Sequence, residues 1–460
     1  MKRTLAEFAR LAGGRLSGAD RPYTEVVSDT RTLAAGQLFV ALRGPNFDGN
    51  DFLAAAAAAG AAGALVTREQ SAPLPQIVVP DTQAALERAA RAWRGDFSGA
   101  LVGVAGSNGK TTTKEMTAAI LAQAGPCLAT RGNLNNHIGV PLTLLRLTGA
   151  ERFAVVEMGA NRAGEVAHLV RLARPDVGLI TNAGAEHLEG FGSLEGVARA
   201  EGEMVAGLAA SATAVINADD EFAPLWRAAT PARVVTFGVR ARADFRASEV
   251  EAAVGVEGFS TRFRLTAPIG AAAIRLNLGG VHNVANALAA AAAAASAGAR
   301  LEHIVAGLAA VRAVPGRLQF RAALGGGWLI DDSYNANPSS VRAAIELLAT
   351  LPGRRWLVLG DMAELGEFAA DEHSGVGEFA RRAGVERLYA TGALAQLAAS
   401  AFGAGGEWLP DVPTLSQALR AALGKAGADV RVLVKGSRFN RLERVVEALS
   451  AAPGAAAGGH

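Results

Sequence analysis

The sequence predicts an α/β protein of three domains built around largely parallel sheets. A chain of 460 residues, of which 50% are hydrophobic, is long enough for about three domains of ~150 residues each. Apolar runs alternate with amphipathic stretches through residues 99–314 and again through 315–450, which is typical of doubly wound, Rossmann-like sheets. The third observation is a glycine-rich turn at 106–109, between an apolar run and a helix-like segment.

This turn predicts a phosphate-binding loop. The segment Gly106-Ser107-Asn108-Gly109-Lys110-Thr111-Thr112 follows the apolar run 101–105 and opens a helix, whose free backbone N–H groups and dipole attract anions. Lys110 can reach the β- and γ-phosphates of a nucleotide, and the Thr111 hydroxyl can bind Mg²⁺. The general pattern also requires a glycine at position 104, where this chain has Val104, so the match is incomplete. We still predict nucleoside triphosphate binding over an empty turn.

Residues 1–98 precede this loop and are expected to form a small α/β unit. The first ten residues carry a charge at Glu7 and no apolar core, which predicts an amphipathic helix rather than a signal peptide. The segment Ser28-Asp29-Thr30-Arg31 follows a short predicted strand at 25–27. Its hydroxyl, carboxylate and guanidinium groups suit a phosphate-bearing ligand. An ordinary capped turn explains the same segment about as well.

In the middle section, polar residues follow several predicted strands. Apolar runs predict parallel strands at 128–130, 154–157, 177–181 and 213–217, and ligands of such sheets lie beyond the carboxyl ends of the strands. Glu157 ends one run and is a candidate Mg²⁺ ligand, or alternatively a helix-capping acid. His187 lies in a dense polar run and is a candidate ligand, or alternatively a structural hydrogen-bonding residue. Asn283 could bind a purine edge, cap the alanine-rich helix after it, or do both.

A boundary is expected at 313–317, where proline and glycine interrupt the pattern. The last section has predicted strands at 328–331, 355–359, 387–391 and 431–435, and polar clusters again follow several of them. It is therefore predicted to be a second α/β domain with its own cleft. The glycine- and alanine-rich tail 451–460 is expected to be disordered.

Composition excludes several classes of function. The formal net charge of +2 is small for a chain of this length, so no nucleic-acid partner is expected. No apolar run has the composition of a membrane span, and we expect no membrane insertion and a cytoplasmic protein. The single cysteine, Cys127, rules out an internal disulfide and is interpreted as a small buried residue rather than a nucleophile.

Taken together, the motifs resemble one family across nearly the whole chain, the ATP-dependent Mur ligases of peptidoglycan synthesis. The matching segments are 28–31 with 36–42, 106–112, 132–136 with 138–141, 157–159, 182–183 with 186–188, 332–338, 360–366 and 435–438. Several separate motifs in the right order make a chance match improbable.

The resemblance implies a three-domain Mur ligase architecture. Residues 1–98 would bind the UDP-sugar, 99–314 would form the central ATP-binding domain, and 315–450 would bind the incoming dipeptide. The implied reaction joins D-Ala-D-Ala to UDP-N-acetylmuramoyl-tripeptide through an acyl phosphate, with ATP and two Mg²⁺ ions. We expect a monomer.

The resemblance also assigns roles to individual residues. The catalytic residues would be Lys110, Glu157, His187 and Glu201, and the metal ligands Thr111, Glu157, His187 and Glu201. The nucleotide would contact the loop Gly106 to Thr112 together with Asn283, Arg317 and Asp332. The other substrates would contact Ser28, Asp29, Thr30, Arg31, Asn133, Asn135, Asn136, Asn335, Asn337, Lys435 and Arg438. For Lys435 and Arg438, a place at the interdomain seam stays an open alternative.

One position departs from the family pattern. Related ligases usually carry a carbamylated lysine near 198–203, whose carbamate helps to hold a second Mg²⁺, and this chain has Glu201 there. A carbamate on lysine is in effect a long carboxylate, so a glutamate can supply the same charge with a shorter reach. Our hypothesis is that Glu201 replaces the modified lysine and removes any need for CO₂.

The sequence leaves three rival interpretations. A folylpolyglutamate synthase shares the ATPase core but does not begin with a UDP-sugar domain like residues 1–98. The sister ligase that forms the tripeptide tends to carry an Asp-Asn-Pro-Arg type signature, whereas this chain has Asn335-Ala336-Asn337-Pro338. The third rival, from another class, is a nucleotide-regulated binding protein without ligase activity.

Overall fold

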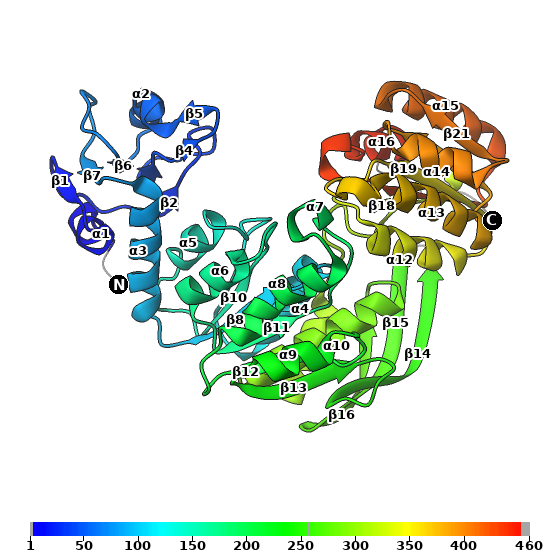
Figure 1. Ribbon diagram of the computed structural model, residues 1–460, viewed down its shortest axis with the longest axis horizontal. Coiled ribbons are helices and arrows are strands. Elements are labelled where there is room, and N and C mark those ends of the chain that lie inside the picture. Colours follow the sequence, from blue (N-terminus) through cyan, green and yellow to red (C-terminus); the bar gives the residue numbers. More distant parts are fainter. Residues whose placement is uncertain (1–2, 256–257, 452–460) are drawn as a thin grey trace.

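The computed structural model describes residues 3–255 and 258–451. Of the tail 451–460 that is expected to be disordered, residues 452–460 lie outside the described residues. Its strands form three large sheets of five, nine and six strands and one small hairpin. In Figure 1 the central unit, coloured cyan to green, lies below and between a blue first unit and a yellow-to-red third unit. The expected boundaries near residues 98 and 314 each fall between two of these sheets.

The first unit holds a sheet in the order β1-β7-β6-β3-β2, parallel except for the pair β1 and β7. Its elements are α1 (Leu5–Ala12), β1 (Arg15–Ser17), β2 (Val26–Val27), β3 (Leu38–Val40), β4 (Arg43–Gly44), β5 (Phe47–Asp48), α2 (Leu53–Ala58), β6 (Gly63–Val66), β7 (Gln76–Val78) and α3 (Thr82–Gly95). The predicted amphipathic helix is α1: Thr4 caps it, and it buries Leu5 and Phe8.

Helix α3 connects the first unit firmly to the central one. Trp93 is 1% exposed and donates its indole N–H to the backbone oxygen of Leu147 at 2.8 Å. Arg94, next along the helix, donates to the backbone oxygen of Ala173 at 2.8 Å and pairs with Asp176 at 3.1 Å. The helix is thus held to the central unit by both packing and hydrogen bonds to the backbone.

The central sheet has the order β16-β15-β14-β13-β12-β11-β8-β10-β9. Its strands are β8 (Ala100–Ala105), β9 (Cys127–Ala129), β10 (Phe153–Glu157), β11 (Val177–Ile180), β12 (Thr213–Asn217), β13 (Arg233–Gly238), β14 (Phe245–Gly255), β15 (Gly258–Ala267) and β16 (Gly270–Leu276). The predicted strands, which correspond to β8–β12, are confirmed as parallel neighbours, and β13 and β14, which were not predicted, continue the sheet in parallel. The antiparallel extension by β15 and β16 was not predicted.

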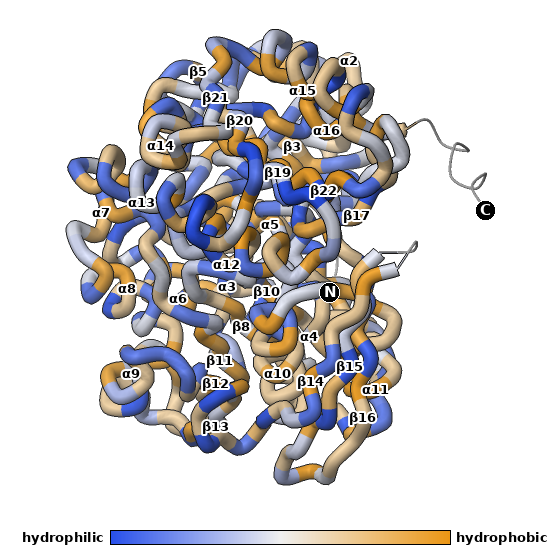
Figure 2. The backbone as a smooth tube through the Cα atoms, turned by 90° about the vertical axis from the view of Figure 1, so that its right-hand side faces the viewer, coloured by the Kyte–Doolittle hydropathy of each residue, from blue (hydrophilic) through white to orange (hydrophobic). Residues whose placement is uncertain are grey.

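Helices cover both faces of this sheet. They are α4 (Lys110–Ala124), α5 (Gly139–Leu144), α6 (Glu165–Ala173), α7 (Leu188–Phe191), α8 (Leu194–Ala206), α9 (Ala223–Ala229), α10 (Val281–Ser296) and α11 (Leu301–Ala310). The alanine run 289–294 in α10 is at most 1% exposed, and this helix has the pale orange of alanine in Figure 2. Small side chains let α10 pack closely against both the sheet and α4.

The third unit is the expected second α/β domain, with strand order β17-β18-β22-β19-β20-β21 and only β17 antiparallel. Its elements are β17 (Gln319–Ala322), β18 (Trp328–Asp332), α12 (Pro338–Ala349), β19 (Arg354–Gly360), α13 (Ala369–Arg382), β20 (Arg387–Thr391), α14 (Ala395–Phe402), β21 (Gly406–Leu409), α15 (Val412–Ala426), β22 (Val430–Lys435) and α16 (Glu443–Leu449). The β14–β15 hairpin reaches this unit (Figure 1), where the rings of Phe259 and Phe320 meet edge to face. Across the described residues, no helix has the length and apolar character needed to cross a membrane.

Two helical glycines should respond oppositely to alanine. A Cβ on Gly307 of α11 would lie 2.4 Å from the Ile120 Cα of α4, so Gly307→Ala is expected to destabilise the fold by about 1–3 kcal/mol. Gly424 of α15 has open space around that position, so Gly424→Ala should stabilise the fold by about 0.5–1 kcal/mol. Urea unfolding followed by circular dichroism measures both changes. Equal effects of the two substitutions would contradict the close packing of α11 on α4.

Candidate active site at the phosphate loop

A cavity of about 900 Å³ opens between the central and third units. Most of the residues proposed from the sequence line it: Ser107, Asn108, Gly109, Lys110, Thr111, Thr112, Asn133, Asn135, Asn136, Glu157, His187, Asn283, Arg317, Asp332, Asn335, Asn337, Lys435 and Arg438. The ends of several parallel strands therefore bring side chains that are distant in the sequence to one place. Ser28, Asp29, Thr30 and Arg31 are not among its lining residues, and neither are Gly106 and Glu201.

The loop between β8 and α4 takes the shape that its glycines allow. Gly106 and Gly109 have φ angles of 117° and 82°, a region that side chains disfavour. A Cβ on Gly106 would lie 2.2 Å from the Thr181 hydroxyl, and one on Gly109 would lie 2.4 Å from the Asn286 amide oxygen. The loop is therefore closely packed against β11 and α10, and both glycines are required by space as well as by backbone conformation.

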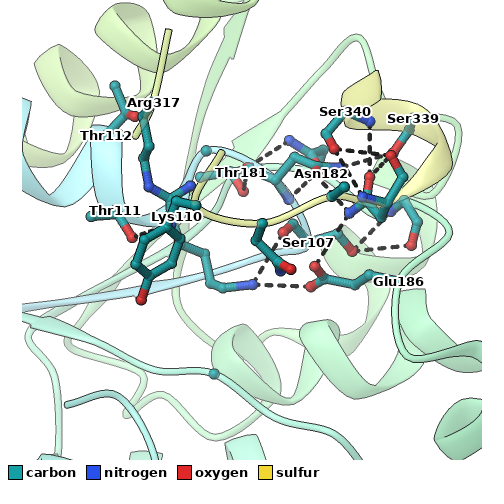
Figure 3. Close-up of a pocket in the computed structure, with 18 of the residues that line it drawn as sticks. Ser107, Lys110, Thr111, Thr112, Thr181, Asn182, Glu186, Arg317, Ser339 and Ser340 are labelled. Atoms are coloured by element: carbon teal, nitrogen blue, oxygen red, sulfur yellow. Dashed lines mark hydrogen bonds and ion pairs between the residues drawn. The ribbon is translucent and has the colours of Figure 1, made fainter. Parts of the chain in front are cut away.

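Lys110 is surrounded by acceptors in this loop. Its ammonium group donates to the backbone oxygens of Gly106 and Ser107 and to Glu186 Oε1 at 3.0 Å. Figure 3 shows the Lys110 and Glu186 side chains pointing at one another. Burial alone would lower the pKa of the Lys110 ammonium, but the carboxylates of Glu186, Glu201 and Glu157 outweigh burial and raise it. Lys110 therefore stays charged.

Thr111 and Glu157 lie together on the other side of the loop. The Thr111 hydroxyl donates to Glu157 Oε1 at 3.3 Å, and Asn135 donates its amide to the same oxygen at 2.9 Å. Glu157 Oε2 is buried and has no hydrogen-bond partner among the described residues. Arg317 donates to the Thr111 hydroxyl at 3.1 Å from the third unit, as Figure 3 shows. The Thr111 hydroxyl oxygen and the unsatisfied Glu157 Oε2 are together chemically suited to bind a cation.

Glu201 approaches the loop from behind, from helix α8. Its Oε2 accepts the backbone N–H of Gly106 at 2.7 Å, and the side chain is 1% exposed. Its Oε1 is also buried and has no hydrogen-bond partner within the described parts of the chain. Burial raises the pKa of the Glu201 carboxyl to about 7, although the nearby Lys110 charge opposes this change. Glu201 thus contacts the phosphate loop itself and not the cavity wall.

The structure does not gather the expected metal ligands into one cluster. Within residues 3–255 and 258–451, no group of three or more His, Cys, Asp or Glu side chains is placed to hold a metal ion. His187 instead forms an ion pair with Glu364 of the third unit, and its ring lies edge to face on Phe191. The residue has a φ of 50° at the start of α7, which turns it toward that unit. The structure therefore does not support a metal site in which Glu157, His187 and Glu201 all act together.

Two predicted contact residues already have structural partners. Asn283 does not cap α10, because the cap position is Gly280 and no side chain bonds there. Its amide nitrogen donates to the backbone oxygen of Gly279 at 2.8 Å, and its oxygen accepts from Asn286 at 3.1 Å. These bonds occupy the amide oxygen of Asn283 and one of its amide hydrogens. Few hydrogen-bonding positions of this side chain are then left for the edge of a purine. Asn283 nevertheless remains part of the cavity wall.

Lys435 is likewise engaged within the third unit. It is 3% exposed and donates to Asp332 Oδ2 at 2.6 Å and to the backbone oxygen of Asn335 at 2.9 Å. Asp332 also accepts the backbone N–H of Leu318 at 3.2 Å, and Leu318 has a φ of 49°. The ion pair therefore anchors the segment that joins the central and third units. This favours a place for Lys435 at the interdomain seam over a contact with the incoming dipeptide.

Polar side chains from α12 reach the phosphate loop. Asn337 caps this helix and donates its amide to Asn108 Oδ1 at 2.8 Å. Asn108 donates in turn to the Ser339 hydroxyl at 2.9 Å. On the far side, Arg317 and Arg438 both lie over the ring of Tyr334, with their guanidinium carbons 4.7 Å and 5.6 Å from its centroid. The third unit thus contributes amide, hydroxyl and guanidinium groups to the cavity.

The segment predicted in the first unit makes mostly local contacts. Arg31 is paired with Asp29 at 2.6 Å, and its side chain is 86% exposed. Hydrogen bonds from Arg31 hold the pKa of the Asp29 carboxyl near 2. The exposed arginine leaves room for a ligand on this unit, away from the nucleotide loop.

Two residues of the family motifs, Glu186 and Tyr334, received no site role from the sequence, and the structure places both in the cavity wall. Glu186 is buried against Lys110, and Tyr334 lies under two arginines. A signal for Glu186 was present, because an acid after strand β11 falls at the same sheet edge as the phosphate loop. The position of Tyr334 depends on how the third unit meets the central one, and no local sequence pattern indicates this arrangement.

Breaking the buried pair at the seam should be costly. Lys435→Met leaves the Asp332 carboxylate without its partner, so we expect a loss of about 3–5 kcal/mol in the free energy of unfolding. The double variant Asp332→Asn with Lys435→Met should lose clearly less than the sum of the two single losses. Urea unfolding of the four proteins gives this coupling energy, and strictly additive losses would show that the pair is not coupled.

Comparison with known proteins is consistent over the whole chain. Three family models match: "Mur ligase family, catalytic domain" at residues 22–94, "Mur ligase middle domain" at 104–294, and "Mur ligase, glutamate ligase domain" at 316–438. The UDP-N-acetylmuramoyl-tripeptide--D-alanyl-D-alanine ligase of Escherichia coli (strain K12) is 45% identical over 448 residues, covering 97% of this chain and 98% of that protein. The ligase of the same name from Bacillus subtilis (strain 168) is 35% identical, covering 98% and 99%.

Solved structures agree with these sequence matches. Crystal structure I of MurF from Acinetobacter baumannii matches with a TM-score of 0.89 at 33% identity, covering 97% of this chain and 98% of that one. The MurF ligase from Thermotoga maritima in complex with ADP matches with a TM-score of 0.78 at 29% identity, covering 92% and 96%. By its full-length identity to curated relatives, the chain belongs to the Mur ligase family.

Proposed function

We propose that this protein is the ATP-dependent ligase that joins D-Ala-D-Ala to UDP-N-acetylmuramoyl-tripeptide in peptidoglycan synthesis. The observation that supports it most is the phosphate loop, with Lys110 and Thr111, in the wall of a cavity that the third unit also lines. The relatives named for this reaction cover almost the entire chain. The relative solved with ADP supports a nucleotide in this cavity.

The reaction class explains why a phosphate loop and a second cleft are needed together. A carboxylate does not react with an amine, so the terminal phosphoryl group of ATP first moves to the peptide carboxylate, which becomes an acyl phosphate. The amine of D-Ala-D-Ala attacks that carbon, and phosphate leaves from the tetrahedral intermediate. Lys110 would stabilise the charge that develops on the moving phosphoryl group. Closure of the third unit would exclude the water that hydrolyses an acyl phosphate.

Mg²⁺ fits the residues on the cavity side of the loop. Thr111 and the unsatisfied Glu157 Oε2 would hold one ion, because Mg²⁺ binds to few protein oxygens and to phosphate and water for the rest. Glu201 lies behind the loop, so its unsatisfied Oε1 would contribute to a second ion through a water, in place of a carbamylated lysine. Mg²⁺ supplies positive charge that offsets the phosphates. His187, held by Glu364, would join such a site only after the third unit moves.

The three units would divide the substrates. Residues 1–98 would bind the UDP-sugar through Ser28, Asp29, Thr30 and Arg31, with Asn133, Asn135 and Asn136 farther along the peptide. Residues 99–314 would bind ATP, with Arg317 and Asp332 at the margin of its site. Residues 315–450 would bind D-Ala-D-Ala through Asn335, Asn337 and Arg438. We assign no oligomeric contact and propose a monomer in the cytoplasm.

A coupled assay tests this function directly. ADP release should require both UDP-N-acetylmuramoyl-tripeptide and D-Ala-D-Ala, because neither half-reaction is completed alone. Lys110→Ala should lower kcat/KM by about 10²–10³-fold, through the loss of one charged donor to the transition state. ATP turnover that ignores both substrates would favour a nucleotide-regulated binding protein. Full activity of Lys110→Ala would refute the role of the loop.

The glutamate at position 201 has its own test. Glu201→Gln keeps the shape but loses the charge, so activity should fall by about 10–100-fold and the Mg²⁺ concentration for half-activity should rise. Bicarbonate should not affect the parent enzyme, whereas Glu201→Lys should regain activity only when bicarbonate is added. Unchanged activity and unchanged Mg²⁺ dependence in Glu201→Gln would reject the replacement of a carbamylated lysine by Glu201.

A further inference from the structure

Lys110 has no donor left for a phosphate in this structure. An ammonium group has three N–H donors, and here they face the backbone oxygens of Gly106 and Ser107 and the carboxylate of Glu186. The lysine side chain is 14% exposed, so water does not provide an easy alternative. A nucleotide phosphate can therefore contact Lys110 only by displacing one of these acceptors.

Glu186 is the acceptor that a phosphate would displace. The two backbone oxygens belong to the loop itself, and its closely packed glycines prevent them from moving away. Glu186 is a side chain on the segment after β11 and can turn. Its negative charge also lies in the wall of the cavity that the phosphates would enter, so the two anions repel each other there.

The third unit holds Glu186 in this position. Asn337 donates one amide hydrogen to Asn108 of the phosphate loop at 2.8 Å and makes a longer contact of 3.5 Å to Glu186 Oε2. Ser339 bonds to both Asn108 and Asn337. The backbone at Gly184 passes so close that a Cβ there would lie 2.7 Å from Asn108 and 2.9 Å from Ser339. Figure 3 shows Ser339 and Glu186 near Ser107 of the phosphate loop.

We propose that Glu186 is a positioning residue that occupies Lys110 until a nucleotide phosphate replaces it, and that Asn337 of the third unit stabilises this resting arrangement. Nucleotide binding then releases Glu186 and weakens its contact with Asn337 of the third unit. Binding of ATP is thereby coupled to the position of the unit that carries the second cleft. This inference rests on the proposed function only in that the cavity binds a nucleotide.

Nucleotide affinity provides the test. Calorimetric titration of the full chain with ADP and Mg²⁺ should show binding about three- to tenfold tighter in Glu186→Gln than in the parent. Glu186→Asp, which keeps the charge but shortens the reach, should also bind ADP more tightly than the parent. Asn337→Ala should give a smaller change in the same direction. Glu189→Gln is the matched control, since it removes an exposed charge three residues along the same segment, and should leave the affinity unchanged.

The direction of the change in ADP affinity shows whether Glu186 competes with phosphate for Lys110. A merely structural role for Glu186 would make both Glu186 variants bind ADP more weakly, so tighter binding is specific to competition for Lys110. Equal or weaker binding in both variants would overturn the proposal. Equal or weaker binding in Asn337→Ala alone would overturn the part played by the third unit. If the parent itself bound no ADP, the proposed function would fail instead, so the two failures are distinguishable.

Discussion

The buried ammonium group of Lys110 is the charge on which the site depends. Three carboxylates, those of Glu157, Glu186 and Glu201, surround it and raise its pKa against the effect of burial. Glu201 also accepts a backbone N–H from the phosphate loop. This one carboxyl group therefore both holds the backbone of the loop and adds to the charge around Lys110. An unpaired buried charge costs far more free energy than a paired one. The stability of each of these charged groups therefore depends on the others.

The two outer units meet the central unit in different ways. The first unit is attached through Trp93 and Arg94, which are buried and bond to backbone oxygens. The third unit meets the central unit through side chains, in particular Asn337 with Asn108 of the phosphate loop and Glu364 with His187 at the start of α7. A hydrogen bond between side chains can be replaced by one to water or ligand at little net cost in free energy. The loss of buried aromatic packing has no such replacement. This difference allows the third unit to respond to what binds at the loop.

Several expectations from the sequence needed correction, and each has a physical reason. Strands β15 and β16 were missed because their apolar residues alternate with polar ones, as in the buried Phe263 and exposed Arg264, whereas the prediction relied on continuous apolar runs. Asn283 was expected to contact a purine, to cap the alanine-rich helix, or both, and Lys435 was expected either to contact the dipeptide or to lie at the interdomain seam. The structure gives them neighbours, Asn286 and Asp332, that use the same groups.

The phosphate loop, the parallel core strands and the family could be predicted from the amino-acid sequence alone, because these depend on local patterns of glycine, apolar runs and residue order. The sequence could not determine which polar groups are already paired, since Glu186 and Lys110 are 76 positions apart and meet only when two strands end side by side. Nor could it place Arg317 beside Thr111, because that contact joins different units. Local sequence encodes backbone conformation, whereas charge pairing depends on distances that only the packed fold creates.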